Sequence, residues 1–324
     1  MKAVVRKAYG GVDELEIRDI ERPEPGPDEV LIKVMAFGIN RAEIYMRQGL
    51  WGDVAAVSGI ECVGTVEQHP QGDLQPGQTV AAIMGGMGRT INGSYAEYTC
   101  LPRNNVVALN SKLDWAELAA IPESYATAWA CLSDNLDLDH CQSLVVRGGT
   151  SALGQAAVNI AAAKDIEVIA STRNQRRVDF LKSIGAAHVV TDTPDLSDQV
   201  RQIHPAGVDA VLDIVGNTTL LDSLRMARKG GSMCIAGFLG GGDPVPLNPL
   251  ADMPPGVNLN FFASFMFGTP GFSLTDIPLQ EIVDNVADKT YKCRPARVFE
   301  FADIKQAHEL MESNEACGKI VVVV

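Results

Sequence analysis

The pattern of apolar and polar positions predicts two kinds of structure along the chain. In the first third, short alternating or β-branched runs separated by Pro and Gly predict strands, for example Leu15 to Ile20 and Glu29 to Ala36. Further along, apolar runs alternate with helical segments. Leu144 to Val146 precedes the alanine-rich stretch Gln155 to Lys164, and a strand over Glu167 to Ser171 precedes a second helix. This alternation predicts an α/β protein with a doubly wound parallel sheet.

A glycine-rich turn joins the first of these strands to the alanine-rich helix, in the pattern Gly149-x-Ser151-x-x-Gly154. Strand, turn and helix in this order form the first unit of a dinucleotide-binding fold, in which a pyrophosphate faces the helix N-terminus. Serine, the smallest polar substitute, stands where the usual fingerprint has its middle glycine. Taken alone, the turn is equally consistent with an ordinary strand–helix connection. With the strands that follow, it predicts cofactor contacts from Gly149, Thr150, Ser151, Ala152, Leu153 and Gly154.

Composition narrows the class of protein. The 324 residues suffice for two domains, and 46% hydrophobic with 21% charged residues is typical of a soluble globular protein. A formal net charge of −13 argues against nucleic acid and anionic membranes as partners. The seven cysteines are dispersed and form no CxxC pair, as expected of reduced thiols in the cytoplasm. We therefore expect a cytoplasmic protein with no nucleic-acid or membrane partner.

Several short motifs follow one another in a fixed order. They are Asn40-x-x-Glu-x-Tyr45-x-Arg47-x-Gly49, Gly59-x-Glu61-x-x-Gly64-x-Val66, Pro76-Gly77, Gly93-x-Tyr95-Ala96-Glu97, Thr127-Ala128, the glycine turn, and Asp303-Ile-x-x-Ala-His-x-x-Met311 with Gly318-Lys319. Together they resemble the medium-chain dehydrogenase/reductase superfamily, in its zinc-free quinone oxidoreductase (zeta-crystallin-like) branch. The resemblance implies a GroES-like substrate domain over residues 1–121 and 268–324 and a Rossmann domain over residues 122–267. It also implies a homodimer joined edge to edge through the Rossmann sheets.

The residues at the metal positions of the zinc-dependent relatives differ in this chain. Those relatives supply a cysteine, the histidine of a Gly-His-Glu motif and a further cysteine. Here Asn40 stands at the cysteine position, and Ile60 replaces the histidine between Gly59 and Glu61. No histidine pairs with a cysteine at metal-ligand spacing. We expect no metal site, and a structural role for Glu61.

The turn after the second strand of the α/β unit bears on the choice between NADH and NADPH. Folds that prefer NAD place Asp or Glu there to bind the ribose 2′-hydroxyl. By the family pattern, that place holds Thr172, followed by Arg173, Asn174 and Arg177. Guanidinium, hydroxyl and amide groups suit a 2′-phosphate, so we expect NADPH. The alternative is a solvated basic turn. Many relatives have tyrosine near the adenosine end where this chain has Asp192, and a carboxylate there would weaken the preference for NADPH.

The resemblance places Asn40 and Tyr45 beside the nicotinamide. Tyr45 could donate a proton to an oxygen that gains negative charge, with Asn40 orienting it. The expected reaction is hydride transfer from NADPH to a quinone or to the β-carbon of an α,β-unsaturated carbonyl (an enone). An equally good alternative for Tyr45 is a half-buried helix residue with a satisfied hydroxyl. Further cofactor contacts expected, each with a core or exposed alternative, are Thr127, Gly237, Phe238, Phe265, Phe267 and Lys319.

Two other functions remain open from the sequence. One is an enoyl-thioester reductase, although no basic groove for a long phosphorylated substrate is visible. The other is a non-catalytic NADPH-binding protein with a redox-sensing or structural role, whose glycine turn would look the same. Residues 84–92 and 240–253 are expected to shape the acceptor pocket, and neither carries a specificity that can be recognised from sequence.

Overall fold

The computed structural model describes all 324 residues and divides them into two compact units. The first unit holds Met1–Glu123, Ser264–Lys289 and Cys293–Val324, and the second holds Ser124–Ala263 and Thr290–Lys292. Compared with the boundaries expected from sequence, residues 122–123 and 264–267 fall in the first unit and residues 290–292 in the second. Phe265 and Phe267 are therefore side chains of the β-rich unit and not, as expected, of the Rossmann part. Asn105 connects this segment to the β-rich unit, because its side chain donates hydrogen bonds to the carbonyls of Ile83 and Phe267, both at 2.9 Å.

The first unit is built on a seven-stranded sheet, with six strands in the order β14-β15-β3-β4-β5-β7 and β6 paired to β3, and it also holds a two-stranded β1-β2 ribbon. Its strands are β1 (Lys2–Arg6), β2 (Leu15–Asp19), β3 (Glu29–Ile39), β4 (Glu61–Gln68), β5 (Thr79–Ile83), β6 (Tyr98–Pro102), β7 (Val106–Ala108), β14 (Arg297–Glu300) and β15 (Ile320–Val323). Its α-helices are α1 (Arg41–Gln48), α2 (Trp115–Ala119), α9 (Leu279–Ala287) and α10 (Ile304–Ser313).

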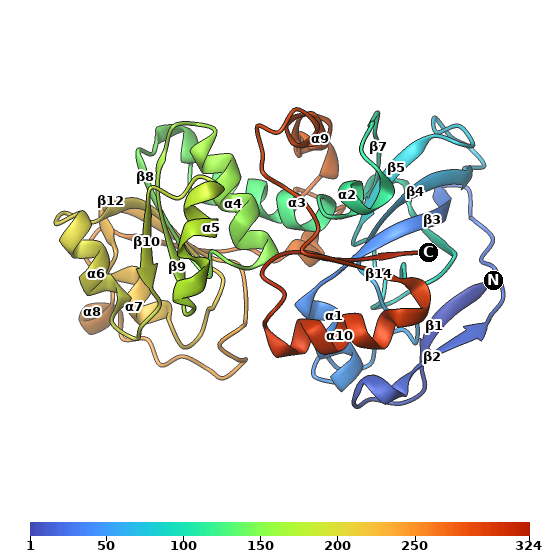
Figure 1. Cartoon of the computed structure of the whole chain (residues 1–324), viewed down its shortest axis with the longest axis horizontal. Helices are drawn as coiled ribbons and strands as arrows, with labels where there is room; N and C mark the ends of the chain where they lie inside the picture. The colour runs from blue at the N-terminus through green and yellow to red at the C-terminus, as the bar shows by residue number, and fades with distance from the viewer. The chain divides into compact units, whose positions relative to one another are not determined.

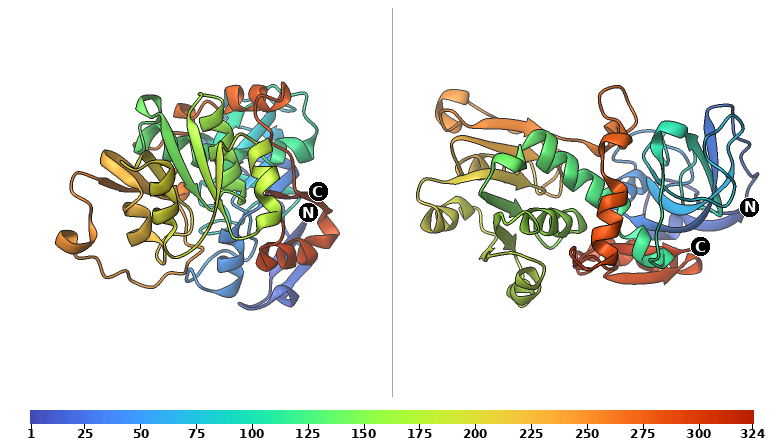
Figure 2. Two further views of the ribbon diagram at one scale, coloured as in Figure 1. Left: turned by 60° about the vertical axis from the view of Figure 1, so that its left-hand side comes forward. Right: turned by 90° about the horizontal axis from the view of Figure 1, so that it is seen from above.

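The large sheet of the first unit contains strands from both the early and the last part of the chain. Strand β15 pairs antiparallel with β3, and the two chain termini lie close together in both views of Figure 2. Buried residues of β3, such as Ile32 and Phe37, join a core that also takes Ile320 of β15 and Ile304 of α10. The unit therefore depends on packing between residues far apart in sequence.

The second unit is a six-stranded sheet in the order β10-β9-β8-β11-β12-β13, and every neighbouring pair is parallel. Its strands are β8 (Ser143–Arg147), β9 (Glu167–Thr172), β10 (His188–Thr191), β11 (Val208–Asp213), β12 (Ala227–Ile235) and β13 (Asn258–Phe261). Its α-helices are α3 (Pro122–Ala130, begun in the first unit), α4 (Ala152–Ala162), α5 (Val178–Ser183), α6 (Leu196–Ile203), α7 (Leu220–Leu224) and α8 (Pro249–Asp252).

Helices cover both faces of this sheet. Figure 1 shows α4 and α5 on one face and α6 and α7 on the other. The strand order reverses direction at β8, which lies between β9 and β11. In open parallel sheets, ligands bind beyond the carboxyl ends of the strands at such a reversal. The predicted doubly wound parallel sheet beside a β-rich part is confirmed, and the reversal directs attention to the turn after β8.

The segment 84–92, for which the sequence predicts only a loop, is folded into tight turns. The backbone N–H groups of Arg89, Thr90 and Ile91 all donate to the carbonyl of Gly86, at 2.9 to 3.1 Å. Gly86 has a φ of 90°, which glycine adopts without strain. The turns therefore fix the position of Arg89. No helix of the protein combines the length and apolar character that crossing a membrane requires.

Candidate active site

The turn after β8 is built for close approach of an anion. Ser151 caps α4, since its hydroxyl accepts a hydrogen bond from the N–H of Gly154 at 3.0 Å and donates to the carbonyl of Gly148 at 2.9 Å. A side chain on Gly154 would overlap the backbone of Gly148 and Gly149. The first N–H groups of α4, at Ala152 and Leu153, have no partner within the helix. Outward-pointing donors at a helix N-terminus fit a dinucleotide pyrophosphate.

The turn after β9 brings together the residues expected to select the cofactor. Thr172 is buried, and its hydroxyl accepts the N–H of Asn174 at 3.1 Å. The side-chain oxygen of Asn174 in turn accepts the N–H of Arg176 at 3.0 Å. Thr172 and Asn174 thus stabilise the turn itself. Arg173 is exposed and makes no ion pair, so its guanidinium is available to an anion. Arg177 follows and is partly buried.

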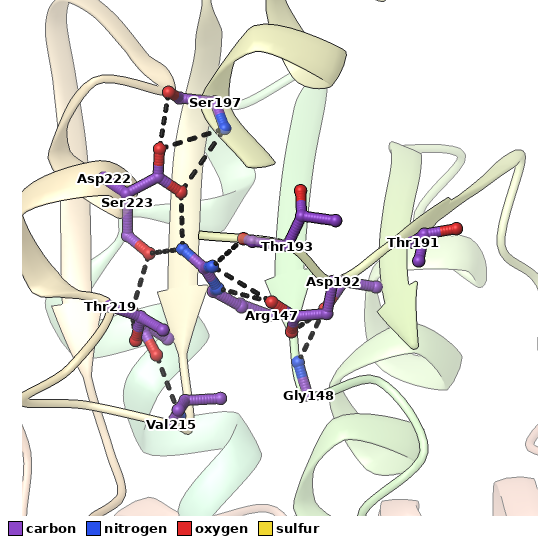
Figure 3. Close-up of polar contacts among 12 residues, drawn as sticks. Arg147, Gly148, Thr191, Asp192, Thr193, Ser197, Val215, Thr219, Asp222 and Ser223 are labelled. Carbon is purple, nitrogen blue, oxygen red and sulfur yellow. Dashed lines mark hydrogen bonds and ion pairs between the residues drawn. The ribbon is translucent and has the colours of Figure 1, made fainter. Parts of the chain in front are cut away.

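Asp192, the carboxylate that seemed adverse to NADPH, is held in a buried network (Figure 3). Arg147, whose side chain is only 1% exposed, pairs with Asp192 at 3.0 Å and with Asp222 at 2.7 Å. The second oxygen of Asp192 accepts the hydroxyl of Ser171 at 2.8 Å, and that hydroxyl accepts the N–H of Gly148 at 3.1 Å. The carboxylate is therefore neutralised by a cation, and it helps to fix the glycine turn.

Sequence reasoning missed both Arg147 and the neighbouring Asp213. Asp213 ends β11 fully buried, and burial raises the pKa of its carboxyl group. It accepts the N–H groups of Val215 and Gly216 at 2.8 and 2.9 Å and the hydroxyl of Ser223 at 2.6 Å. It thereby shapes the turn after β11, as Ser171 does the glycine turn after β8. A usable signal was present, because Arg147 is the one charged residue in an otherwise apolar strand that runs into the glycine turn.

In the first unit, Asn40 and Lys319 meet in one buried cluster. The side-chain oxygen of Asn40 accepts Nζ of Lys319 at 2.6 Å, and its Nδ2 donates to Glu61 at 2.9 Å. Lys319 also forms an ion pair with Glu61. Although burial opposes the charge, attraction to Glu61 raises the pKa of Lys319. The amide of Asn40 is thus occupied within the protein, and Lys319 is 3% exposed.

Glu61 is the centre of this cluster. Besides Lys319 and Asn40, its carboxylate accepts the backbone N–H of Glu123 at 2.8 Å. The adjacent position on β3 is Gly38, where a methyl group would overlap both Lys319 and Glu61. Glycine at this position leaves room for the buried ion pair. The cluster fixes the start of α1, the helix that carries Tyr45.

Tyr45 is half-buried on α1, with its ring centroid 5.7 Å from that of Trp51. Burial raises the pKa of its phenol, so the group carries its proton at neutral pH. Arg47 on the same helix is fully buried and pairs with Glu312 of α10, so it serves the packing of the two helices.

The remaining expected contacts differ in exposure. In the second unit, Thr127 is buried on α3, and Phe238 is 40% exposed with its ring 5.9 Å from that of Phe261. Gly237, just beyond β12, packs so closely on the carbonyl of Ile214 that a side chain would overlap it. In the first unit, Phe265 is 49% exposed, whereas Phe267 is 3% exposed and belongs to the interior. Phe265 is thus better placed than Phe267 to meet a ligand. No group of three or more His, Cys, Asp or Glu side chains could hold a metal ion.

Comparison with known proteins identifies the class. The alcohol dehydrogenase GroES-like domain matches residues 26–111, and a family described as zinc-binding dehydrogenase matches residues 152–269. The chain is 27% identical to the quinone oxidoreductase of Lama guanicoe, across 100% of this chain and 97% of that protein. It is 26% identical to a probable quinone oxidoreductase of Schizosaccharomyces pombe, across 95% and 93%. A solved NAD-dependent alcohol dehydrogenase superposes over the whole of both chains with a TM-score of 0.84 at 26% identity.

A Rossmann unit with a capped glycine turn and a GroES-like β unit in one chain define an oxidoreductase of a family that uses a nicotinamide cofactor. The two matched domains together cover more than half of the chain, which belongs to the medium-chain dehydrogenase/reductase superfamily, and its quinone oxidoreductase relatives are 26–27% identical. The resemblance predicted from the ordered motifs is confirmed.

The buried cluster also contains an acid whose ionisation should make stability depend on pH. Glu43 of α1 is completely buried and accepts the N–H groups of Asn40 and Ile60, at 2.8 and 3.1 Å. Burial raises the pKa of Glu43 to about 8, although these hydrogen bonds and Lys319 oppose it. Between the ordinary pKa of a glutamate and about 8, the folded protein holds a proton that the unfolded chain has released.

We therefore expect the free energy of unfolding to fall as the pH rises from about 5 to 8, by up to about 1.4 kcal/mol per pH unit from this residue. Glu43→Gln should flatten that slope, whatever its effect on stability at one pH. The measurement is denaturant unfolding over a pH series, with the exposed Asp19→Asn as control. Equal slopes for the wild type and Glu43→Gln would show that Glu43 does not titrate in this range.

Proposed function

We propose that this protein reduces quinones or α,β-unsaturated carbonyls with NADPH and without a metal. The observation that carries the proposal is the engagement of Asn40 by Lys319 and Glu61. At the position where zinc-dependent relatives have a ligand cysteine, the side chain is tied into a buried ion pair. On the helix that Asn40 begins, we assign the phenol of Tyr45 to act on the acceptor oxygen. Quinone oxidoreductase relatives matched over nearly their whole length support the choice of acceptor.

The residues present fit a nicotinamide dinucleotide, which when bound supplies the hydride. The glycine turn from Gly149 to Gly154 would hold the pyrophosphate, and Thr127, Gly237 and Phe238 are proposed as further contacts. Relatives differ in cofactor, since one solved neighbour is named as NAD-dependent and a mycobacterial one as complexed with NADPH. The choice for this chain therefore rests on its own residues. Arg173 without an acidic neighbour, and Asp192 neutralised by Arg147, support NADPH.

For Arg173→Gln we expect NADPH to bind roughly tenfold more weakly, because one charge-assisted hydrogen bond to the 2′-phosphate is lost at an exposed site. NADH, which lacks that phosphate, should bind as before. Calorimetric titration of both cofactors gives the ratio of their dissociation constants. Arg176→Gln is the matched control, because it removes an exposed guanidinium from the same turn. Equal weakening of NADPH and NADH by Arg173→Gln would contradict the assignment.

The proposed role of Tyr45 is to protonate the acceptor oxygen. An oxygen that receives negative charge is stabilised by a donor already in place, and a phenol whose pKa is raised by burial keeps its proton to donate. Glu43 fixes the start of α1 by accepting the N–H of Asn40, and Asn40 links that start to Lys319. Asn40 thus acts through the position of Tyr45, since its own amide is occupied.

Replacing Tyr45 by Phe should lower kcat roughly a hundredfold with the same NADPH affinity, because the proton donor is lost while the ring remains. The assay is NADPH oxidation against a panel of quinones and enones, with binding measured separately. Tyr98→Phe, which removes a phenol from β6 of the same unit, is the control. An unchanged rate with every acceptor would remove Tyr45 from the chemistry. Tight NADPH binding by the wild type without turnover of any acceptor would favour a sensing or structural protein.

The edge of the Rossmann sheet supports a homodimer. Strand β13 is the outer strand and pairs only with β12. Phe261 in it is 54% exposed, and an exposed strand edge with an apolar side chain favours pairing with a second copy. We expect light scattering to give twice the mass of one chain, and Phe261→Asp to shift the protein towards the monomer. A wild-type monomer at micromolar concentration would contradict this arrangement.

A further inference from the structure

Arg89 of the first unit has no acidic partner, although the chain carries 40 acidic and 27 basic residues. Arg89 lies in the tight turns of residues 84–92, where its N–H donates to Gly86 and its carbonyl accepts the N–H of Ala55 at 2.9 Å. Its guanidinium carbon lies over two aromatic rings, 5.2 Å from the centroid of Trp51 and 5.0 Å from that of Phe265. The guanidinium forms no ion pair and donates no hydrogen bond within the protein.

The two rings determine what this guanidinium can do. Aromatic faces attract a guanidinium, and this attraction uses none of its N–H donors. Stacking therefore holds the side chain without using its hydrogen-bonding capacity. Two parallel N–H donors match the two oxygens of a carboxylate. Because the turn and the rings already restrict Arg89, less conformational entropy is lost when it binds an anion.

The neighbours of Arg89 connect it to the proposed proton donor. Trp51 contacts the ring of Tyr45 as well as Arg89, so one indole lies against both groups. Phe265, the second ring that Arg89 contacts, is half-exposed. Three segments far apart in sequence, around residues 45–55, 84–92 and 264–267, thus meet within one unit.

We propose that Arg89 binds a carboxylate on the acceptor, placed away from the bond that is reduced. This inference rests on the proposed function and deepens it, since it makes the preferred substrates acidic quinones or enones. Trp51 and Phe265 hold the guanidinium and provide apolar surface for the carbon chain between the carboxylate and the reacting group. The segment 84–92, in which the sequence showed no specificity, then supplies the residue that selects the acceptor.

The test uses two acceptors with the same reacting group, a cyclohexenone that carries a carboxylate on a short saturated arm and its methyl ester. We expect the wild type to prefer the acid over the ester roughly tenfold or more in kcat/KM, mainly through KM. Arg89→Gln should remove the preference and leave the ester within about twofold of wild type. Arg89→Lys keeps the positive charge but loses the paired N–H donors of the guanidinium, so it should retain only part of the preference for the acid. Arg22→Gln is the matched control, because Arg22 also stacks on a ring, that of Tyr98, but pairs with Glu67.

Binding of the saturated, unreactive acid, measured by calorimetry, separates this inference from the proposed function. Loss of its binding in Arg89→Gln but not in Arg22→Gln supports the anion site even if no acceptor is reduced, in which case only the proposed function fails. Turnover of acid and ester at equal efficiency by the wild type overturns the inference and leaves the reductase intact. An equal loss for acid and ester in Arg89→Gln also overturns it, because Arg89 would then serve only the packing of Trp51 and Phe265.

Discussion

The buried ion pair between Lys319 and Glu61 is the constraint on which the first unit depends. Removing two charges from water is costly, and the cost is offset only when each charge finds close partners. Glu61 finds Lys319, the amide of Asn40 and the N–H of Glu123. These groups come from β4, the segment before β15, the start of α1 and the start of α3. Loss of either charge would leave the other buried and unpaired, so the ends of the chain and the helix that carries Tyr45 hold their positions together.

The second unit also buries a charge network, here with one cation and two carboxylates. One buried cation, Arg147, lies among the carboxylates of Asp192 and Asp222, and hydroxyl and backbone N–H groups satisfy the remaining oxygens. The network reaches the glycine turn through Ser171. The carboxylates of Asp192 and Asp222 are paired inside the protein with Arg147, next to the place where a dinucleotide phosphate would bind. An acidic protein can therefore bind an anionic cofactor without its own carboxylates repelling it.

Local features were predictable from the sequence, and long-range ones were not. Helix α1 follows from the apolar spacing of Arg41 to Gln48 and the stop at Gly49, which adopts the left-handed conformation. The glycine turn follows from its pattern. In contrast, Asp192 and Arg147 are 45 residues apart, and Asn40 and Lys319 are 279 apart. No local pattern encodes such pairs, so the sequence could not show that Asp192 is neutralised or that Lys319 is buried.

On the two proposals above, Arg173 and Arg89 divide recognition between the units. Arg173 follows a strand of the Rossmann sheet and is exposed, so its attraction to a phosphate should weaken as salt rises. Arg89 is partly covered by two rings, where screening is weaker and bidentate geometry counts for more. The proposals thus assign cofactor choice and acceptor choice to separate short turns, each outside the elements that build the core. Such turns can change without disturbing either buried charge network, which is how one fold can keep its hydride chemistry and still serve different acceptors.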